Sequence, residues 1–306
     1  LENLIMKNLI YSIFIITFIS SCDIIEEPYL NNNAGGVDTT SNQYVKNILI
    51  EDFTGHLCQN CPDAARELEA IHDVYGAQII GLAIHVGNTF ARPYPLSESK
   101  FTYDFRSKWG EELDNFFNIT DAGLPKGMIN RIGYPNDHRK DKGQWLASVG
   151  DELNKEVIFG INISSTLSSD NAEITINTDA LKNITGTYKL VVCLTENDIV
   201  NWQKDGAVED ENYIHNHVLR SVISSTWGDE ITPNSDINNG DSFEHTYSIN
   251  LSDLENFNIN HSSDVLFLGN GQAGDWNINN FGVVAYIYDI DNYEILQAEQ
   301  ISLSSN

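Results

Sequence analysis

The sequence is poor in basic residues. It has 17 Lys and Arg against 44 Asp and Glu in 306 residues, which gives a formal net charge of -27. Because such a chain would repel a polyanion, nucleic acid is excluded as a partner. The acidic residues are spread along the chain instead of forming one tail, so the charge indicates a well-solvated surface and identifies no ligand.

A glycine-rich phosphate loop is also missing. The stretch GNGQAG (residues 269–274) opens no expected helix, so nucleotide binding has no support. The stretch DIDNYE (residues 289–294) lacks the spacing of a calcium loop and is predicted to be a hairpin turn. The sequence therefore predicts no cofactor.

Even at the start of the chain, the hydrophobic run is too short to span a membrane. LIYSIFIITFI (residues 9–19) has the length of a signal-peptide core and falls short of the ~20 residues that a spanning helix needs. It ends in ISSC (residues 19–22), which resembles the lipobox of bacterial lipoproteins. We predict that residues 1–21 are removed and that Cys22 carries the lipid that anchors the protein to an envelope membrane. Ordinary cleavage nearby, with Cys22 unmodified, is the alternative.

The folded part is predicted to begin near residue 44, after a flexible tether over residues 22–43 that lacks apolar periodicity. Apolar runs at 44–53 and 77–87 flank an amphipathic helix at 62–76, a pattern typical of a right-handed βαβ unit with parallel strands. A first domain over residues 44–156 is completed by three further predicted elements: a helix at 105–119, a strand at 124–133 and a helix at 142–156.

The second half changes to short alternating strands separated by turn residues. With no helix expected between them, they predict an antiparallel β-sandwich over residues 157–306. DVLFLGN (residues 264–270) is one of the predicted strands, and residues 205–230 are a long excursion between two others.

Cysteine is scarce, and two of the four residues form the motif Cys58-x-x-Cys61. The motif opens a predicted helix, whose N-terminal N–H groups and partial positive charge stabilise a thiolate. Cys58 is predicted to be the exposed attacking thiol and Cys61 the resolving thiol of a disulfide exchange. Two alternatives stay open: a purely structural disulfide, and a zinc site that would need His56 and His85 as further ligands.

Several other residues have two interpretations. In one interpretation, His56 lowers the pKa of Cys58 or carries a proton during exchange. In the other, His56 is a polar loop residue without a role. His215 and His217 would share one face of a strand and could bind a metal with the acidic residues 209–211, but packing between domains, together with Arg220, is the favoured interpretation. His85 is predicted to be a core histidine with its hydrogen bonds satisfied, and Cys193 an inert core residue.

The segments ILIEDFTGHLCQNCP, IIGLAIHVG and GLPKGMINR resemble a thioredoxin-like domain, over residues 44–156 with an insertion at 88–121. The resemblance implies that Asp52 is the buried acid that helps to deprotonate Cys61, although it is also a charged residue that ends a strand beside Glu51. It further implies that Pro125 is a cis-proline facing the disulfide. No Trp precedes the motif, and Gln-Asn replaces the usual Gly-Pro within it.

EDFTGHLCQNCPDAA, INR, YIHNHVLR and the ending VVAYIYD…EILQA together resemble the outer-membrane-protein-28-related family of bacterial lipoproteins, over nearly the whole mature length. The resemblance implies an outer-membrane lipoprotein, on the periplasmic or the surface face, with a thioredoxin-like domain followed by an Ig-like sandwich. Two functions follow as expectations. One is thiol–disulfide exchange with an envelope protein substrate, and the other is a non-enzymatic surface binding or assembly module with a structural disulfide.

Overall fold

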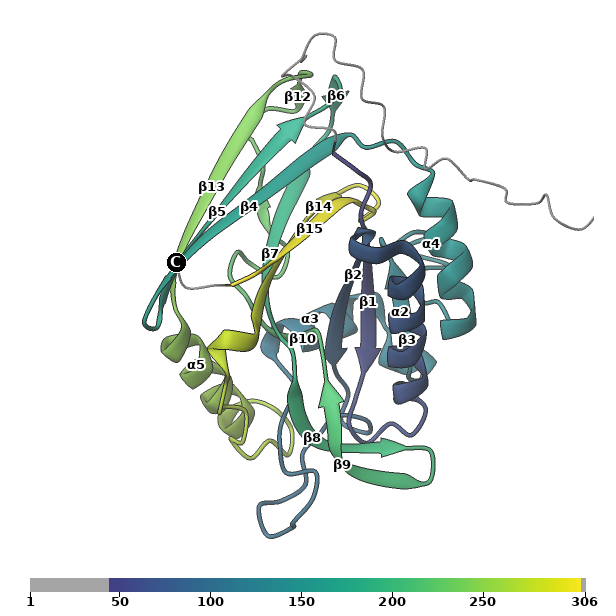
Figure 1. The fold of residues 1–306 in the computed structure, drawn as a ribbon, viewed down its shortest axis with the longest axis vertical. Coiled ribbons are helices and arrows are strands. Elements are labelled where there is room, and N and C mark those ends of the chain that lie inside the picture. Colours follow the sequence, from purple (N-terminus) through teal and green to yellow (C-terminus); the bar gives the residue numbers. More distant parts are fainter. Residues whose placement is uncertain (1–43, 304–306) are drawn as a thin grey trace, which may run out of the picture. The chain divides into compact units, whose positions relative to one another are not determined.

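One mixed β-sheet runs through the described part of the chain, residues 44–303 of the computed structural model (Figure 1). Along the sheet the strands follow in the order β15 (Ile295–Ser302), β14 (Phe281–Asp289), β7 (Tyr188–Glu196), β10 (Val218–Val222), β2 (Ile79–His85), β1 (Ile48–Thr54) and β3 (Lys126–Ile129). A short strand, β11 (Asp229–Glu230), also pairs with β7. The predicted signal segment, the tether and Cys22 lie outside the described residues.

The predicted βαβ unit is confirmed. β1 and β2 are parallel, with Ile48 opposite Ile79 and Thr54 opposite His85, and α2 (Cys61–Tyr75) connects them. All seven residues of β1 are buried, which explains why this strand is an unbroken apolar run rather than an alternating one. β3 pairs with β1 in the antiparallel direction.

Helices cover both faces of this part of the sheet. On one face, Ile48 and Ile50 pack with α2 and α4 (Trp145–Leu153) around the buried Trp145. On the other face, Leu49 and Phe53 belong to a core that α3 (Lys108–Phe117) completes. Because neighbouring side chains of a strand point to opposite faces, β1 contributes to both cores.

A second sheet covers the C-terminal part of the first. It contains β13 (Ser242–Asn250), β5 (Asn171–Ala180) and β4 (Phe159–Ser168), which lie beside β14 and β15 in Figure 1. Isoleucines of β4 and β5 share a hydrophobic core with apolar residues of β7 and β14. The chain is thus a mixed α/β protein made mostly of strands, and the large sheet takes strands from both sides of residue 156.

Two local predictions are wrong. Residues 251–264 form helix α5 (Leu251–Asp264) where no helix was expected, and residues 264–270 contain no strand. α5 is rich in Asn and Ser and has few apolar residues, so its sequence shows no clear apolar face. Asn250 is the N-cap, and its side chain accepts a hydrogen bond from the Asp253 N–H at the start of this helix.

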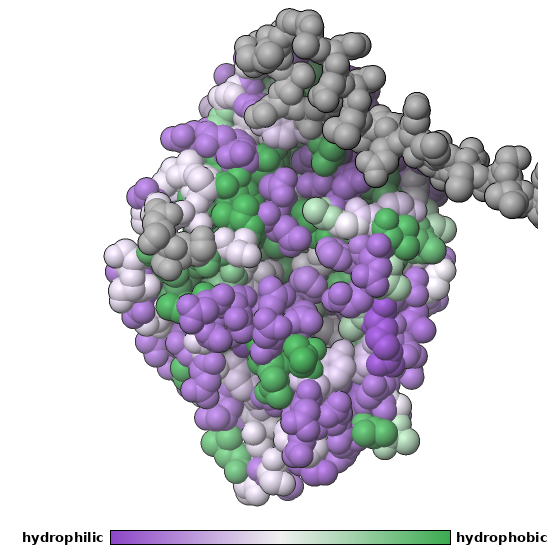
Figure 2. All heavy atoms as spheres, in the orientation of Figure 1, coloured by the Kyte–Doolittle hydropathy of each residue, from purple (hydrophilic) through white to green (hydrophobic). Residues whose placement is uncertain are grey.

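A two-stranded hairpin, β8 (Ile199–Asp205) and β9 (Val208–His215), begins before the predicted excursion at 205–230 and continues into it. Two further short strands, β6 (Ile184–Thr185) and β12 (Asp236–Ile237), pair with each other. The face drawn in Figure 2 is mainly hydrophilic with small separate hydrophobic patches, as the charge of the chain leads one to expect. None of the helices in residues 44–303 has the length and apolar character that crossing a membrane requires.

Candidate functional site

Cys58 and Cys61 form a disulfide at the junction of β1 and α2. Cys61 is the first residue of α2, and Pro62 follows it at a position where the helix needs no N–H donor. The predicted strand–motif–helix arrangement is confirmed.

The disulfide is buried, with exposed fractions of 3% for Cys58 and 1% for Cys61. The prediction of an exposed Cys58 is therefore wrong. The reason is the β8–β9 hairpin, which lies against the loop that carries the motif. The Gln203 side-chain amide donates to the carbonyls of Gly55 (3.3 Å) and Cys58 (3.1 Å).

Backbone hydrogen bonds and one ion pair strengthen this contact. The N–H of Lys204 donates to the His56 carbonyl, and the N–H of Gly206 donates to the Gln59 carbonyl, both at 2.9 Å. At the surface, Arg66 of α2 contacts the Asp205 carboxylate at 2.9 Å. The hairpin is thus joined to both sides of the Cys-x-x-Cys motif.

Asp52 is buried beside the motif. Its Oδ1 has no hydrogen-bond partner among the described residues, and burial raises the pKa of its carboxyl to about 7. Asp52 and Cys61 line the same cavity of about 170 Å³. Neighbouring Glu51 points to the other face of β1 and pairs with Arg131 at 2.6 Å, so Asp52 is the acid on the Cys61 side.

His56 is also buried, and its Nε2 lies 3.2 Å from the Arg92 carbonyl oxygen. Burial lowers the pKa of its imidazole to about 3, and nearby positive charge adds to the effect. A neutral His56 supplies no positive charge to a Cys58 thiolate. His56 instead connects the loop that carries the motif to the segment that follows β2, through its contact with Arg92.

His85 and His215 both pack against the ring of Phe105, and their own rings are neighbours. Their rings lie 4.6 Å and 4.5 Å from the Phe105 ring, centroid to centroid, and 5.6 Å from each other. Burial lowers the pKa of both imidazoles. Neither ring nitrogen of His85 has a hydrogen-bond partner among the described residues, so His85 is buried as predicted but not satisfied.

The two histidines of YIHNHVLR do not share one strand. β9 ends at His215, β10 begins at Val218, and His217 between them has a left-handed φ of 57°. His215 is buried, whereas His217 is partly exposed, with its Nε2 3.6 Å from Glu69 Oε1. Within residues 44–303 no three His, Cys, Asp or Glu side chains form a group that could hold a metal ion.

Pro125 follows a cis peptide bond with Leu124. Together with Asn60 of the motif it lines an open hollow of about 450 Å³, to which Lys126 and Lys142 also contribute. This hollow is the open surface next to the Cys-x-x-Cys motif on the β3 side.

The remaining sequence candidates are structural. Cys193 is buried in β7, and burial raises the pKa of its thiol. Arg220 is buried and its Nε donates to the Glu196 carboxylate at 2.7 Å. The sequence analysis did not identify Gln203 and Lys204 as site residues. No sequence pattern near them indicates that the β8–β9 hairpin contacts the Cys-x-x-Cys motif.

A family model for outer membrane protein Omp28 matches residues 111–275, more than half of the chain. No protein with a curated functional description matches this chain. Among solved structures, HBP35 of Porphyromonas gingivalis is similar with a TM-score of 0.58 and 19% identity, over 86% of this chain and 77% of that one. A protein from Agrobacterium tumefaciens reaches a TM-score of 0.47 at 14% identity, over 86% and 97% of the two chains. A domain of the outer membrane lipoprotein Omp28 from Porphyromonas gingivalis reaches 0.30 at 16% identity, over 50% and 93%.

The likeness to HBP35 concerns the fold alone, because the identity is low. The family match carries the assignment, since it runs from within α3 through the β8–β9 hairpin to beyond α5. The chain belongs to the Omp28 family and is an outer membrane protein.

Proposed function

We propose that this protein is a lipid-anchored outer-membrane thiol–disulfide exchange protein that acts through Cys58 and Cys61. In this proposal residues 44–156 are a thioredoxin-like domain and residues 157–306 an Ig-like sandwich. One observation carries the proposal: an unpartnered, buried Asp52 with a pKa of about 7 lines the same cavity as Cys61. A carboxyl with such a pKa takes up and releases a proton near neutral pH, as general acid–base chemistry requires.

The exchange proceeds in two steps. In the reduced protein, the Cys58 thiolate attacks one sulfur of a substrate disulfide, and the other substrate sulfur leaves as a thiolate. Cys61 then gives its proton to Asp52 and attacks Cys58 Sγ, which releases the second substrate thiolate and re-forms the Cys58–Cys61 disulfide. Two electrons pass to the substrate, and the reverse sequence oxidises a substrate dithiol.

Access to Cys58 requires the β8–β9 hairpin to move. At 3% exposure, Cys58 offers no surface for in-line attack by a protein thiol. The contacts that hold the hairpin are a few hydrogen bonds, two exposed ion pairs (Arg66–Asp205 and Lys100–Glu209) and the packing of His215 on Phe105. The polar contacts are weak enough to open locally. Opening the hairpin would leave the core strands in place.

The same burial favours the second candidate function, a surface binding or assembly lipoprotein with a structural disulfide. A disulfide that is covered by hydrogen-bonded backbone is protected from reductants. In that case the disulfide only fixes the turn that joins β1 to α2.

Redox titration with trapping separates the two functions. We expect the purified protein to equilibrate with glutathione buffers at a potential above about -300 mV, the limit for inert structural disulfides. In cell envelopes, Cys61→Ser should accumulate mixed disulfides with other proteins, and the Cys58→Ser/Cys61→Ser double variant is the matched control. A pair that stays oxidised below that potential and traps nothing would reject exchange and leave the binding module.

A further inference from the structure

An open hollow of about 470 Å³ is lined in part by Leu57, a residue of the loop that carries the motif. We call it the Arg92–Lys204 hollow. Its lining includes Leu57, Arg92, Tyr94, Lys204, Phe267 and Leu268, and it includes no Asp or Glu. Leu57 directly precedes Cys58, so the hollow borders the loop that carries the disulfide.

Within residues 44–303, neither cation of the hollow has an ion-pair partner. Of the sixteen Lys and Arg in residues 44–303, twelve have a carboxylate of a described residue within 4.0 Å; the exceptions are Lys46, Arg92, Arg139 and Lys204. Acidic residues outnumber basic ones 44 to 17, so two unpaired cations in one hollow are unusual for this chain. Two like charges held together favour an anion between them.

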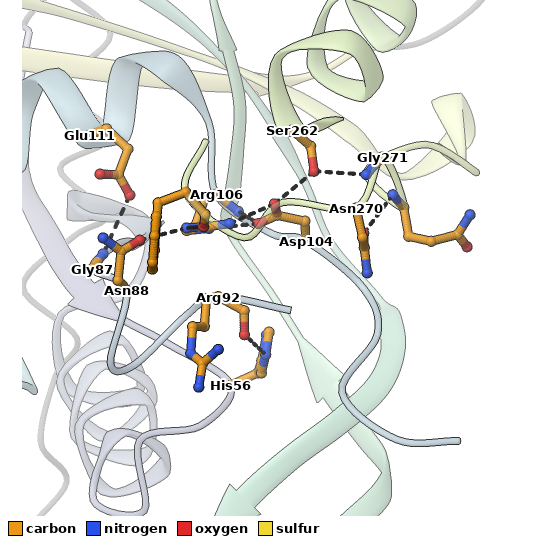
Figure 3. A network of polar contacts seen from close by, with 12 residues as sticks. His56, Gly87, Asn88, Arg92, Asp104, Arg106, Glu111, Ser262, Asn270 and Gly271 are labelled. Atoms are coloured by element: carbon orange, nitrogen blue, oxygen red, sulfur yellow. Dashed lines mark hydrogen bonds and ion pairs between the residues drawn. The ribbon is translucent and has the colours of Figure 1, made fainter. Parts of the chain in front are cut away.

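While the β8–β9 hairpin is closed, the backbones of Arg92 and Lys204 are both held by His56. The buried His56 ring contacts the Arg92 carbonyl, and the His56 carbonyl accepts from the Lys204 N–H. Figure 3 shows the His56–Arg92 contact, while no interaction is drawn to the Arg92 guanidinium. Lys204 Nζ donates to the Tyr94 hydroxyl at 3.4 Å and lies 5.6 Å from the Phe101 ring centroid. Neither contact neutralises its charge.

A separate buried network supports the far wall of the hollow. Arg106 donates to the Asn88 side chain and to the Phe267 carbonyl, at 2.9 Å and 3.1 Å, and its charge is balanced by Asp104 (Figure 3). The Phe267 and Leu268 side chains remain 63% and 52% exposed. The hollow therefore joins two unpaired cations to an exposed apolar rim.

We propose that the Arg92–Lys204 hollow binds a carboxylate side chain of an acidic, partly apolar segment of the polypeptide substrate. The proposal rests on the exchange function and adds its substrate class: a cysteine flanked by acidic and apolar residues. The two cations can both pair with one carboxylate, and the apolar rim can contact apolar side chains next to that carboxylate in the bound segment. An anionic membrane surface is a poorer occupant, because its many negative charges face the whole -27 chain, whereas a single carboxylate faces mainly the two cations of the hollow.

The test measures peptide binding to the oxidised protein, which needs no redox chemistry. The probe is acetyl-Leu-Glu-Ser-Phe-amide, followed by NMR titration at low ionic strength, and the matched peptide has Gln in place of Glu. We expect the Glu peptide to bind about tenfold more tightly than the Gln peptide, and Arg92→Gln or Lys204→Gln to remove that preference. Arg139→Gln, which also removes an unpaired cation, should leave binding unchanged.

Equal binding of the two peptides, or an equal effect of Arg92→Gln and Arg139→Gln, would overturn the proposal. Binding of phosphatidylglycerol vesicles that needs Arg92 and Lys204, without peptide binding, would replace the peptide by a lipid headgroup and also overturn it. A second arm measures exchange with disulfide-linked peptides that have Cys in place of Ser. If neither peptide exchanges but the Glu peptide still binds through Arg92, the exchange function fails while the binding site stands.

Discussion

Replacing Asp52 with asparagine should stabilise the protein, and more so as the pH rises. The carboxyl has a pKa of about 7 in the folded state against an ordinary value of 3.8, because burial disfavours its charged form. Between pH 3.8 and pH 7 the Asp52 carboxyl is protonated in the folded protein but ionised in the unfolded chain. The contribution of Asp52 to the free energy of unfolding is therefore complete below pH 3.8 and is lost as the pH rises to 7. At about 1.4 kcal/mol per pH unit, the total loss is about 4 kcal/mol.

Asparagine has the shape of the neutral acid and does not titrate. Relative to wild type, Asp52→Asn should gain about 3 kcal/mol more unfolding free energy at pH 8 than at pH 5, since the remaining loss occurs below pH 5. Water in the adjoining cavity would reduce this value. Urea titrations with the disulfide intact measure it, and Asp73→Asn on the exposed surface of α2 is the control. An advantage that is equal at pH 5 and pH 8 would refute the assigned pKa of Asp52.

Three further predictions concern other sites. Arg131→Met should lower the unfolding free energy by about 3–5 kcal/mol, because it leaves the buried Glu51 carboxylate unpaired, and adding Glu51→Gln should recover part of the loss in urea titrations. No recovery would contradict this account. Native Cys193 should resist iodoacetamide at pH 8 and react only after unfolding, because it is buried and its thiol pKa is raised; mass spectrometry after alkylation reports this. Cys22→Ala should move the protein from the detergent phase to the aqueous phase in Triton X-114 partitioning, and an unchanged distribution would reject lipidation.

The elements around the disulfide were predictable because their signals are local. The apolar runs of β1 and β2 and the apolar face of α2 lie within about forty residues, and Gly76 and Pro62 mark the helix ends. α5 was missed for the opposite reason. It is held by contacts with distant segments, in which Asn258 donates to the Arg220 carbonyl and Ser262 donates to the Asp104 carboxylate.

The sequence by itself determined the Cys-x-x-Cys motif, its position between strand and helix, and the acidity of the chain. Only the tertiary structure decided that the disulfide is covered, that Asp52 holds its proton to about pH 7, and that Arg92 and Lys204 line one hollow. Each of these properties depends on residues far apart in the chain; Gln203, for example, bonds to Cys58 across 145 positions. Burial and charge pairing are properties of the assembled surface, so no local pattern encodes them.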